Sequence, residues 1–178
     1  MSIKFFWRCE SETLDGTDDY SAGDTTATAT GTPSISASGV KVGTNGLVTV
    51  DTTDYYSFDS ASIVTVDQGS CGYWIQYKTS VPISALNVGV HFRNSADPDD
   101  HIGSLTGSSQ EQRLSIRKTG AVATIIATTV ANLAIDTWYF VVFRWHISAD
   151  KRAIEVYDSS LTLIDSTEDL ATDLAAFT

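Results

Sequence analysis

The sequence has little cysteine, little proline and little positive charge. Its 178 residues include 2 Cys, 3 Pro, and 11 Lys and Arg against 22 Asp and Glu. Two cysteines exclude a disulfide-rich scaffold, and no Cys and His spacing matches a zinc site. We read Cys9 and Cys71 as small buried residues, and whether they pair stays open. The formal net charge of −11 argues against nucleic acid or an anionic membrane as partners.

Long apolar runs are also missing, since no stretch approaches the roughly 20 residues of a membrane span. The first ten residues do not form a signal peptide, because their apolar stretch is short and is flanked by Arg8 and Glu10. We therefore expect a protein that is made in the cytoplasm and does not bind a membrane.

The sequence does contain enough apolar and aromatic residues to form a packed core. Hydrophobic residues make up 42% and aromatic residues 10% of the chain. Short runs of Thr, Ser, Val, Ile and aromatics are separated by Gly, Asn, Asp and Ser, which is typical of strands and turns. We predict one all-β domain over 1–178, an antiparallel β-sandwich in which 167–178 form a short helix or tail. The predicted strands are 3–9, 25–30, 46–51, 54–58, 62–67, 70–78, 85–93, 100–105, 112–118, 121–129, 137–147, 152–158 and 161–165.

The strongest predicted strand is 137–147. Its odd positions are apolar or aromatic, and its even positions become polar toward the end. Phe143 and Trp145 are therefore predicted to lie in the core. Arg144 and His146 belong to the other face, which either covers a core or lines a binding groove.

Three stretches carry a resemblance to a known superfamily. The first is a glycine-marked strand pair that leads to an aspartate and aromatics, at 39–50 and 54–58. The second is a strand with a central Trp, at 72–78. The third is a Trp and an apolar strand followed by a short Tyr-containing strand, at 136–143 and 154–158. In this order they resemble the concanavalin A-like lectin/glucanase superfamily, in particular its laminin-G-like jelly rolls. The resemblance implies a jelly roll, and it supports the fold more than any activity.

Two features depart from that family. The short strand ends in Asp158-Ser-Ser instead of Asp-Gly, and the chain stops at Thr178 before the usual closing strand. The strand 3–9 has apolar groups on both faces, so an open edge beside it would be a liability. We expect a partner subunit, or the segment after Thr167, to cover it. The bare start with Phe-Phe-Trp resembles jelly rolls found in tailed-phage genomes.

Catalytic carboxylates are sought because some members of the superfamily are β-glucanases, which carry Glu-x-Asp-x-x-Glu on one strand. The nearest match here is Glu10-Ser-Glu12-Thr-Leu-Asp15, and the acids of Glu155-Val-Tyr-Asp158 face opposite sides of a strand. No Gly-x-Ser-x-Gly elbow accompanies the three histidines. We predict that the protein is not an enzyme.

Calcium is the one metal that the resemblance favours, since laminin-G-like folds often hold an ion at a rim loop. No cofactor is required by the sequence. Two Asp-rich loops offer the oxygen ligands that calcium prefers, and the alternative is that they are ordinary polar turns. The candidate ligands are Asp15, Asp18, Asp19, Asp97, Asp99 and Asp100.

The charge distribution predicts a ligand-binding patch. Residues 1–75 carry a net charge of −7 and residues 153–178 one of −6, whereas residues 76–152 carry +2. Strands of this middle section are expected to share one sheet, so that their polar faces form one surface. The alternative is cross-strand ion pairing on a solvated face, for example between Arg144 and Glu155. The candidate ligand-binding residues are Asn87, His91, Arg93, Arg113, Arg117, Phe140, Arg144 and His146.

Together these observations predict a non-catalytic interaction module. The most specific hypothesis is a virion-associated structural protein, either a capsid decoration or a tail-associated domain, that forms a homo-oligomer or binds capsid or tail subunits or a surface glycan. One alternative is a stand-alone carbohydrate-binding lectin, for which Trp7, Trp74 or Trp138 would have to lie on a sheet face. The second alternative is a glycoside hydrolase or lyase.

Overall fold

The computed structural model describes residues 5–11, 13, 20–21, 26–49, 53–58, 67–78, 87–93, 101–107, 111–117, 124–127 and 133–169. Contacts within the chain divide it into two compact units, Met1–Thr65 and Val66–Thr178. Each unit is described by itself, and the single domain over 1–178 stays a prediction.

The unit Met1–Thr65 contains pairs of short antiparallel strands. Trp7 packs edge-on against Tyr56 and Phe58, with ring centroids 5.7 and 5.0 Å apart. The Asp54 carboxylate is buried and accepts a hydrogen bond of 2.8 Å from the Thr32 backbone N–H. The pairs are β1 (Phe5–Phe6) with β2 (Tyr20–Ser21), β3 (Thr28–Thr30) with β6 (Tyr55–Ser57), and β4 (Ser34–Ser36) with β5 (Gly46–Val48), and the 3₁₀ turn η1 (Ala37–Gly39) follows β4.

The unit Val66–Thr178 is built from two four-stranded antiparallel sheets. Sheet I has the order β14-β13-β12-β7 and sheet II the order β11-β10-β9-β8. The 3₁₀ turn η2 (Ile147–Ala149) joins β12 to β13. The strands are β7 (Gln68–Gln76), β8 (Asn87–Arg93), β9 (His101–Thr106), β10 (Gln112–Arg117), β11 (Thr124–Ala127), β12 (Trp138–His146), β13 (Lys151–Tyr157) and β14 (Leu163–Asp169).

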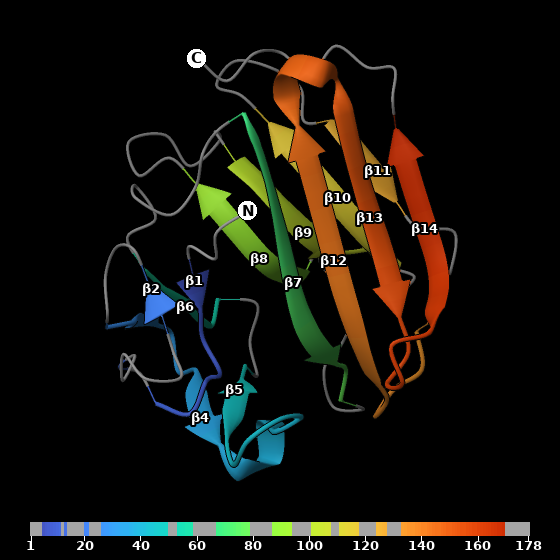
Figure 1. The fold of residues 1–178 in the computed structure, drawn as a ribbon. Coiled ribbons are helices and arrows are strands. Elements are labelled where there is room, and N and C mark those ends of the chain that lie inside the picture. The colour runs from blue at the N-terminus through green and yellow to red at the C-terminus, as the bar shows by residue number, and fades with distance from the viewer. Residues whose placement is uncertain are drawn as a thin grey trace. The chain divides into compact units, whose positions relative to one another are not determined.

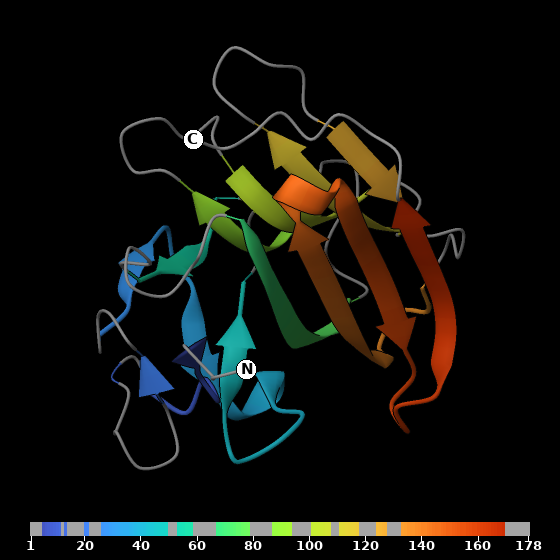
Figure 2. The same cartoon turned by 45° about the horizontal axis from the view of Figure 1, so that its top comes forward.

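The two sheets are stacked as the layers of a sandwich. The chain leaves sheet I after β7, forms all four strands of sheet II in succession, and returns to place β12 beside β7. Figure 1 draws β12 and β13 in front of β10 and β11, and Figure 2 separates the two layers. The described residues therefore confirm the all-β class and its antiparallel sheets, and the unit Val66–Thr178 has the layers of a sandwich.

The core between the sheets is aromatic at one end. Phe143 is 0% and Trp145 5% exposed, which confirms the predicted core face of 137–147. The Phe92 ring of sheet II meets both rings, with centroids 6.3 Å from Phe143 and 5.8 Å from Trp145. Gly69, the register partner of Trp145 on β7, makes room for the indole, because a Cβ there would collide with it.

At the other end the core is polar. The Tyr73 hydroxyl lies 2.6 Å from the Ser104 hydroxyl of the opposite sheet. Gln112 Nε2 donates a 2.6 Å hydrogen bond to the Tyr77 hydroxyl, which also bonds Thr106. Burial raises the pKa of both tyrosines, so this layer stays uncharged. These bonds tie β7 to β9 and β10, since buried polar groups need partners.

Strand alternation placed most elements correctly. Among the described residues 5–9 of the predicted strand 3–9, Phe5–Phe6 form a strand, and Thr167–Asp169, where we expected the start of a helix or tail, continue β14. The short strands β2 and β4 were not predicted. Residues 170–178 and the predicted strand 62–67, except Asp67, lie outside the described residues. Among the described residues no helix is long and apolar enough to cross a membrane.

Candidate functional site: an aromatic row on a sheet face

The outer face of sheet I carries a row of three aromatic side chains. Phe140 is the register partner of Trp74 on β7 and of Tyr157 on β13. Because side chains alternate along a strand, and Tyr139 and Val141 point into the core, Phe140 and its partners point outward. All three rings are partly exposed. We call Trp74, Phe140 and Tyr157 the aromatic row.

The rings of the aromatic row are close but not parallel. Their centroids are 5.1 Å apart between Trp74 and Phe140 and 6.4 Å apart between Phe140 and Tyr157, with interplanar angles of 50° and 52°. Gly72 is exposed beside them, and a Cβ at this position would lie 2.9 Å from Phe140 Cζ. The glycine therefore leaves the Phe140 ring room to lie over β7.

A polar chain flanks the aromatic row. Arg144 Nη2 donates to Glu155 Oε1, and the Tyr157 hydroxyl donates to Glu155 Oε2 over 2.8 Å. This hydrogen bond to a carboxylate raises the pKa of Tyr157. The Arg144 side chain is 55% exposed and that of Glu155 19%. The cross-strand pair that we gave as the alternative reading of Arg144 is thus present, and it lies beside the rings.

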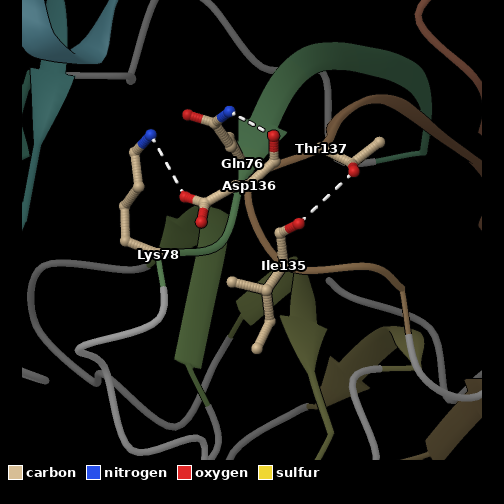
Figure 3. Close-up of polar contacts among 5 residues, drawn as sticks. All are labelled: Gln76, Lys78, Ile135, Asp136 and Thr137. Atoms are coloured by element: carbon tan, nitrogen blue, oxygen red, sulfur yellow. Dashed lines mark hydrogen bonds and ion pairs between the residues drawn. The ribbon is translucent and has the colours of Figure 1, made fainter.

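A second polar group lies at the end of β7 (Figure 3). Gln76, the register partner of Trp138, donates through Nε2 to the Asp136 carbonyl over 2.9 Å. Lys78 Nζ lies 3.4 Å from Asp136 Oδ1, and both side chains are about half exposed. Asp136 has a positive φ of 57°. Trp138 and Gln76 therefore continue the outer face beyond the aromatic row with polar groups within reach.

The predicted ligand-binding residues do not share one surface. Phe140, Arg144 and His146 lie on β12 in sheet I. His91, Arg93, Arg113 and Arg117 lie on β8 and β10 in sheet II. The expectation of one patch was wrong because β12 pairs with β7 and β13, and not with the strands that precede it in the sequence.

The outer face of sheet II holds two stacked histidines. The rings of His91 and His101 have centroids 5.1 Å apart and are inclined by 10°. His101 Nε2 lies 2.9 Å from the Ser115 hydroxyl, whereas both nitrogens of His91 are buried without a hydrogen-bond partner among the described residues. Burial, together with the nearby His101 and Arg93, lowers the pKa of His91 to about 3.

The remaining predicted ligand residues take different environments. Arg113 is paired with Glu111, and His146 Nε2 lies 3.7 Å from Asp67 Oδ2. Asn87 is the register partner of Thr106, but the register of β8 shifts between Val88 and His91. Because of this bulge, side chains do not alternate regularly between the two faces along β8.

The calcium prediction falls outside the described residues. Asp15, Asp18, Asp19, Asp97, Asp99 and Asp100 all lie there. Within the part of the chain that the structure describes, no group of three or more His, Cys, Asp or Glu could hold a metal ion. Cys9 and Cys71 do not form a disulfide, and burial raises the pKa of Cys71 to about 12.

The acidic residues considered for catalysis have structural contacts. Glu10 accepts hydrogen bonds from the backbone N–H groups of Thr44 (2.8 Å) and Asn45 (3.0 Å), and these bonds, with one from the Thr44 hydroxyl, lower its pKa. Glu12 and Asp15 lie outside the described residues. Asp158 accepts from the backbone N–H groups of Ser160 and Thr162, which holds the turn before β14.

Sequence reasoning missed that Trp74, Tyr157 and Glu155 join Phe140 and Arg144. Alternation gave each strand its two faces, but the row needs the registers between β7, β12 and β13. The signal in the sequence is that alternation places an aromatic at an outward position of each of the three strands, namely Trp74, Phe140 and Tyr157.

No protein-family model, curated protein or solved structure matches this chain. The resemblance to the concanavalin A-like superfamily therefore stays a prediction, and the site is interpreted from its own geometry.

Proposed function

We propose that the protein is a non-catalytic interaction module that binds a glycan through the aromatic row. The observation that carries this proposal is the alignment of three partly exposed aromatic rings in one register row, beside a guanidinium–carboxylate pair. A jelly roll of the concanavalin A-like type is the fold that we propose for the sandwich.

A glycan suits this surface because a sugar ring has two kinds of surface. Its C–H groups carry a weak positive charge and are attracted to the negative face of an aromatic ring. Its hydroxyl groups both donate and accept hydrogen bonds. The aromatic row supplies the first contact, and Arg144 with Glu155 supplies donors and an acceptor for the second. Binding sites of this kind combine apolar surface with a few placed polar groups.

We propose a non-catalytic module because the carboxylates of Glu155, Glu10 and Asp158 already make structural hydrogen bonds. Cleavage of a glycosidic bond requires two carboxyl groups placed on either side of that bond. Glu155 contacts Arg144 and Tyr157 through its two oxygens, and Glu10 and Asp158 hold backbone turns. Incubation with the glycans that bind should therefore release no reducing ends.

The test is a binding screen by calorimetry against soluble glucans, mannans, xylans, galactans and pectin. Trp74→Ala and Tyr157→Ala should each weaken the binding found for the wild type by about tenfold or more, which corresponds to 1.4 kcal/mol. Tyr55→Ala is the matched control, because Tyr55 is also an exposed aromatic residue, at 47%, and is not part of the aromatic row. Folding of each variant is checked by circular dichroism.

Absence of binding to every glycan, or binding that both substitutions in the aromatic row leave unchanged, would refute this function.

A second candidate, a contact with other subunits in a virion or another assembly, is favoured by β14. Leu163 and Ile164 at the start of this strand are 51% and 40% exposed, and Leu161 in the turn before it is 58% exposed. In the described part of the chain, β14 is the edge strand of sheet I. Edge strands with apolar side chains are sites of pairing. Light scattering should then give a mass above 19.2 kDa that falls to the monomer value in Leu163→Lys.

A further inference from the structure

We infer that the aromatic row binds a single chain of uncharged sugars, and that Glu155 with Arg144 selects against acidic sugars. This inference rests on the proposed glycan binding and names the class of glycan. It follows from the tilt of the rings, from the pairing of the polar groups, and from the charges on the outer face of sheet I.

The tilt of the rings excludes a flat ligand surface. Each ring is turned by 50° or 52° from its neighbour, so no plane lies against the faces of all three. A crystalline polysaccharide presents such a plane. A single dissolved chain can turn between its sugar units and follow the rings one by one. The centroid separations of 5.1 and 6.4 Å are close to the length of one sugar ring, so each aromatic ring can take one sugar.

The polar pair presents a donor and an acceptor side by side. The Arg144 guanidinium has five N–H donors, and its Nη2 donates to Glu155. The Arg144 side chain is still 55% exposed, so other donors can reach a ligand. The Glu155 carboxylate is held on both sides by Arg144 and the Tyr157 hydroxyl. Two neighbouring hydroxyls of one sugar can meet this arrangement, one accepting from the guanidinium and one donating to the carboxylate. The pair is therefore preorganised for a diol.

The outer face of sheet I offers an acidic sugar no excess of positive charge. Its outer positions carry Arg144 and Lys151 against Glu155 and Glu168, as the register across β12, β13 and β14 shows. A uronate bound to Arg144 would have to displace the Glu155 carboxylate from the guanidinium or lie beside it, and two neighbouring carboxylates repel each other. The net charge of −11 adds a long-range repulsion of polyanions.

The experiment titrates the wild-type protein with oligosaccharides of one to six units. The probes are cello-, manno- and xylo-oligosaccharides and, as the acidic counterpart, oligogalacturonates of the same lengths. We expect the affinity for a neutral series to rise up to the trisaccharide, one sugar for each aromatic ring, and then to level off. Oligogalacturonates should bind at least about tenfold more weakly, and crystalline cellulose powder should not remove the protein from solution.

Two variants test the role of the polar pair. Glu155→Gln should weaken neutral binding and reduce the discrimination against oligogalacturonates, because the carboxylate charge is lost. Glu168→Gln makes the same change in charge on the same face and has no part in the pair, so it should leave both affinities unchanged.

Each adverse outcome has a separate meaning. Tighter binding of oligogalacturonates that is still lost in Trp74→Ala would overturn the inference and keep the proposed function. Adsorption to crystalline cellulose would overturn the single-chain geometry. Equal effects of Glu155→Gln and Glu168→Gln would show that only net charge matters. Binding to none of the probes by the wild type would overturn the inference together with the proposed function.

Discussion

On the outer face of sheet I the aromatic row and Arg144 are partly exposed, whereas on the outer face of sheet II Leu105 and Ser115 are only 7% and 1% exposed. Both faces arise from the same alternation of side chains along antiparallel strands. Sheet I keeps its outer rings and its ion pair in contact with water. Sheet II buries Leu105 and Ser115 at outer positions and stacks two histidines beside them, while Arg113 and Arg117 on the same face stay partly exposed. Alternation therefore decides which side chains point outward, but it does not decide which of them reach solvent.

This difference is the reason why we assign ligand binding to sheet I. A ligand can replace water on an exposed surface, whereas a side chain such as Leu105, which is 7% exposed, is already covered by protein atoms. The basic residues of sheet II drew attention in the sequence because of their charge. In the structure, Arg113 is held by Glu111 and its side chain is 28% exposed, compared with 55% for Arg144.

The largest expected effect concerns the buried outer position of sheet II. Leu105→Ala should lower the free energy of unfolding by about 2–5 kcal/mol, because it leaves a cavity. Val142→Ala, at a partly exposed outer position of sheet I, should cost clearly less. Urea unfolding followed by Trp fluorescence measures both values. Equal costs at the two positions would remove the contrast between the two faces.

The next effect is a loss of stability in acid through His91. Its pKa is lowered from 6.5 to about 3 by burial and by the charges of His101 and Arg93. Between these two pH values His91 is therefore protonated in the unfolded chain but neutral in the folded protein. The contribution is complete above about pH 6.5 and decreases as the pH falls toward 3. At pH 4 the loss should be about 3 kcal/mol, at 1.4 kcal/mol for each pKa unit.

The measurement compares urea unfolding at pH 7 and pH 4 for the wild type and His91→Gln. His91→Gln should flatten the dependence on pH. An NMR titration in which His91 takes up its proton near pH 6.5 would contradict the burial of this ring.

The smallest effect compares the ion pairs of the two faces. Arg113→Ala removes the charged hydrogen bond to Glu111, which is 9% exposed, and should cost about 1–3 kcal/mol, as is usual for a hydrogen bond between charged groups that solvent screens little. Arg144→Ala removes a pair that solvent screens and should cost less than about 1 kcal/mol. Thermal unfolding of both variants gives the order, and a larger cost for Arg144→Ala would reverse our ranking of the faces.

The sequence was sufficient for the strands and for the inner face of β12, because period-two alternation is a local property. The buried positions of Phe143 and Trp145 followed from it. The local pattern could not show the bulge after Val88, which depends on how β8 meets β9. It also could not show that β12 belongs to a different sheet from β8 and β10.

The candidate site was accessible from the sequence only in part. Phe140 and Arg144 were predicted, and the ion pair with Glu155 was anticipated as an alternative to ligand binding. Trp74 was considered only as one of three tryptophans for the lectin alternative, because its pairing with Phe140 joins β7 to β12, which are separated in the sequence by the whole of sheet II. Tyr157 was missed because its place beside Phe140 depends on the register between β12 and β13. Long-range register of this kind is fixed by packing and not by the pattern of one strand.

The glycines beneath the rings have a consequence for how this protein can change. A side chain at Gly69 would meet Trp145, one at Gly72 would meet Phe140, and one at Gly103 would meet His91. In each case the ring occupies the space above a glycine, an arrangement also known from the pairing of aromatics with glycines across strands. Neither member of such a pair can be replaced alone without a clash or a gap. These positions should therefore vary together, two at a time, among sequences that share this sheet arrangement, and Gly72 with Phe140 would report whether the aromatic row is kept.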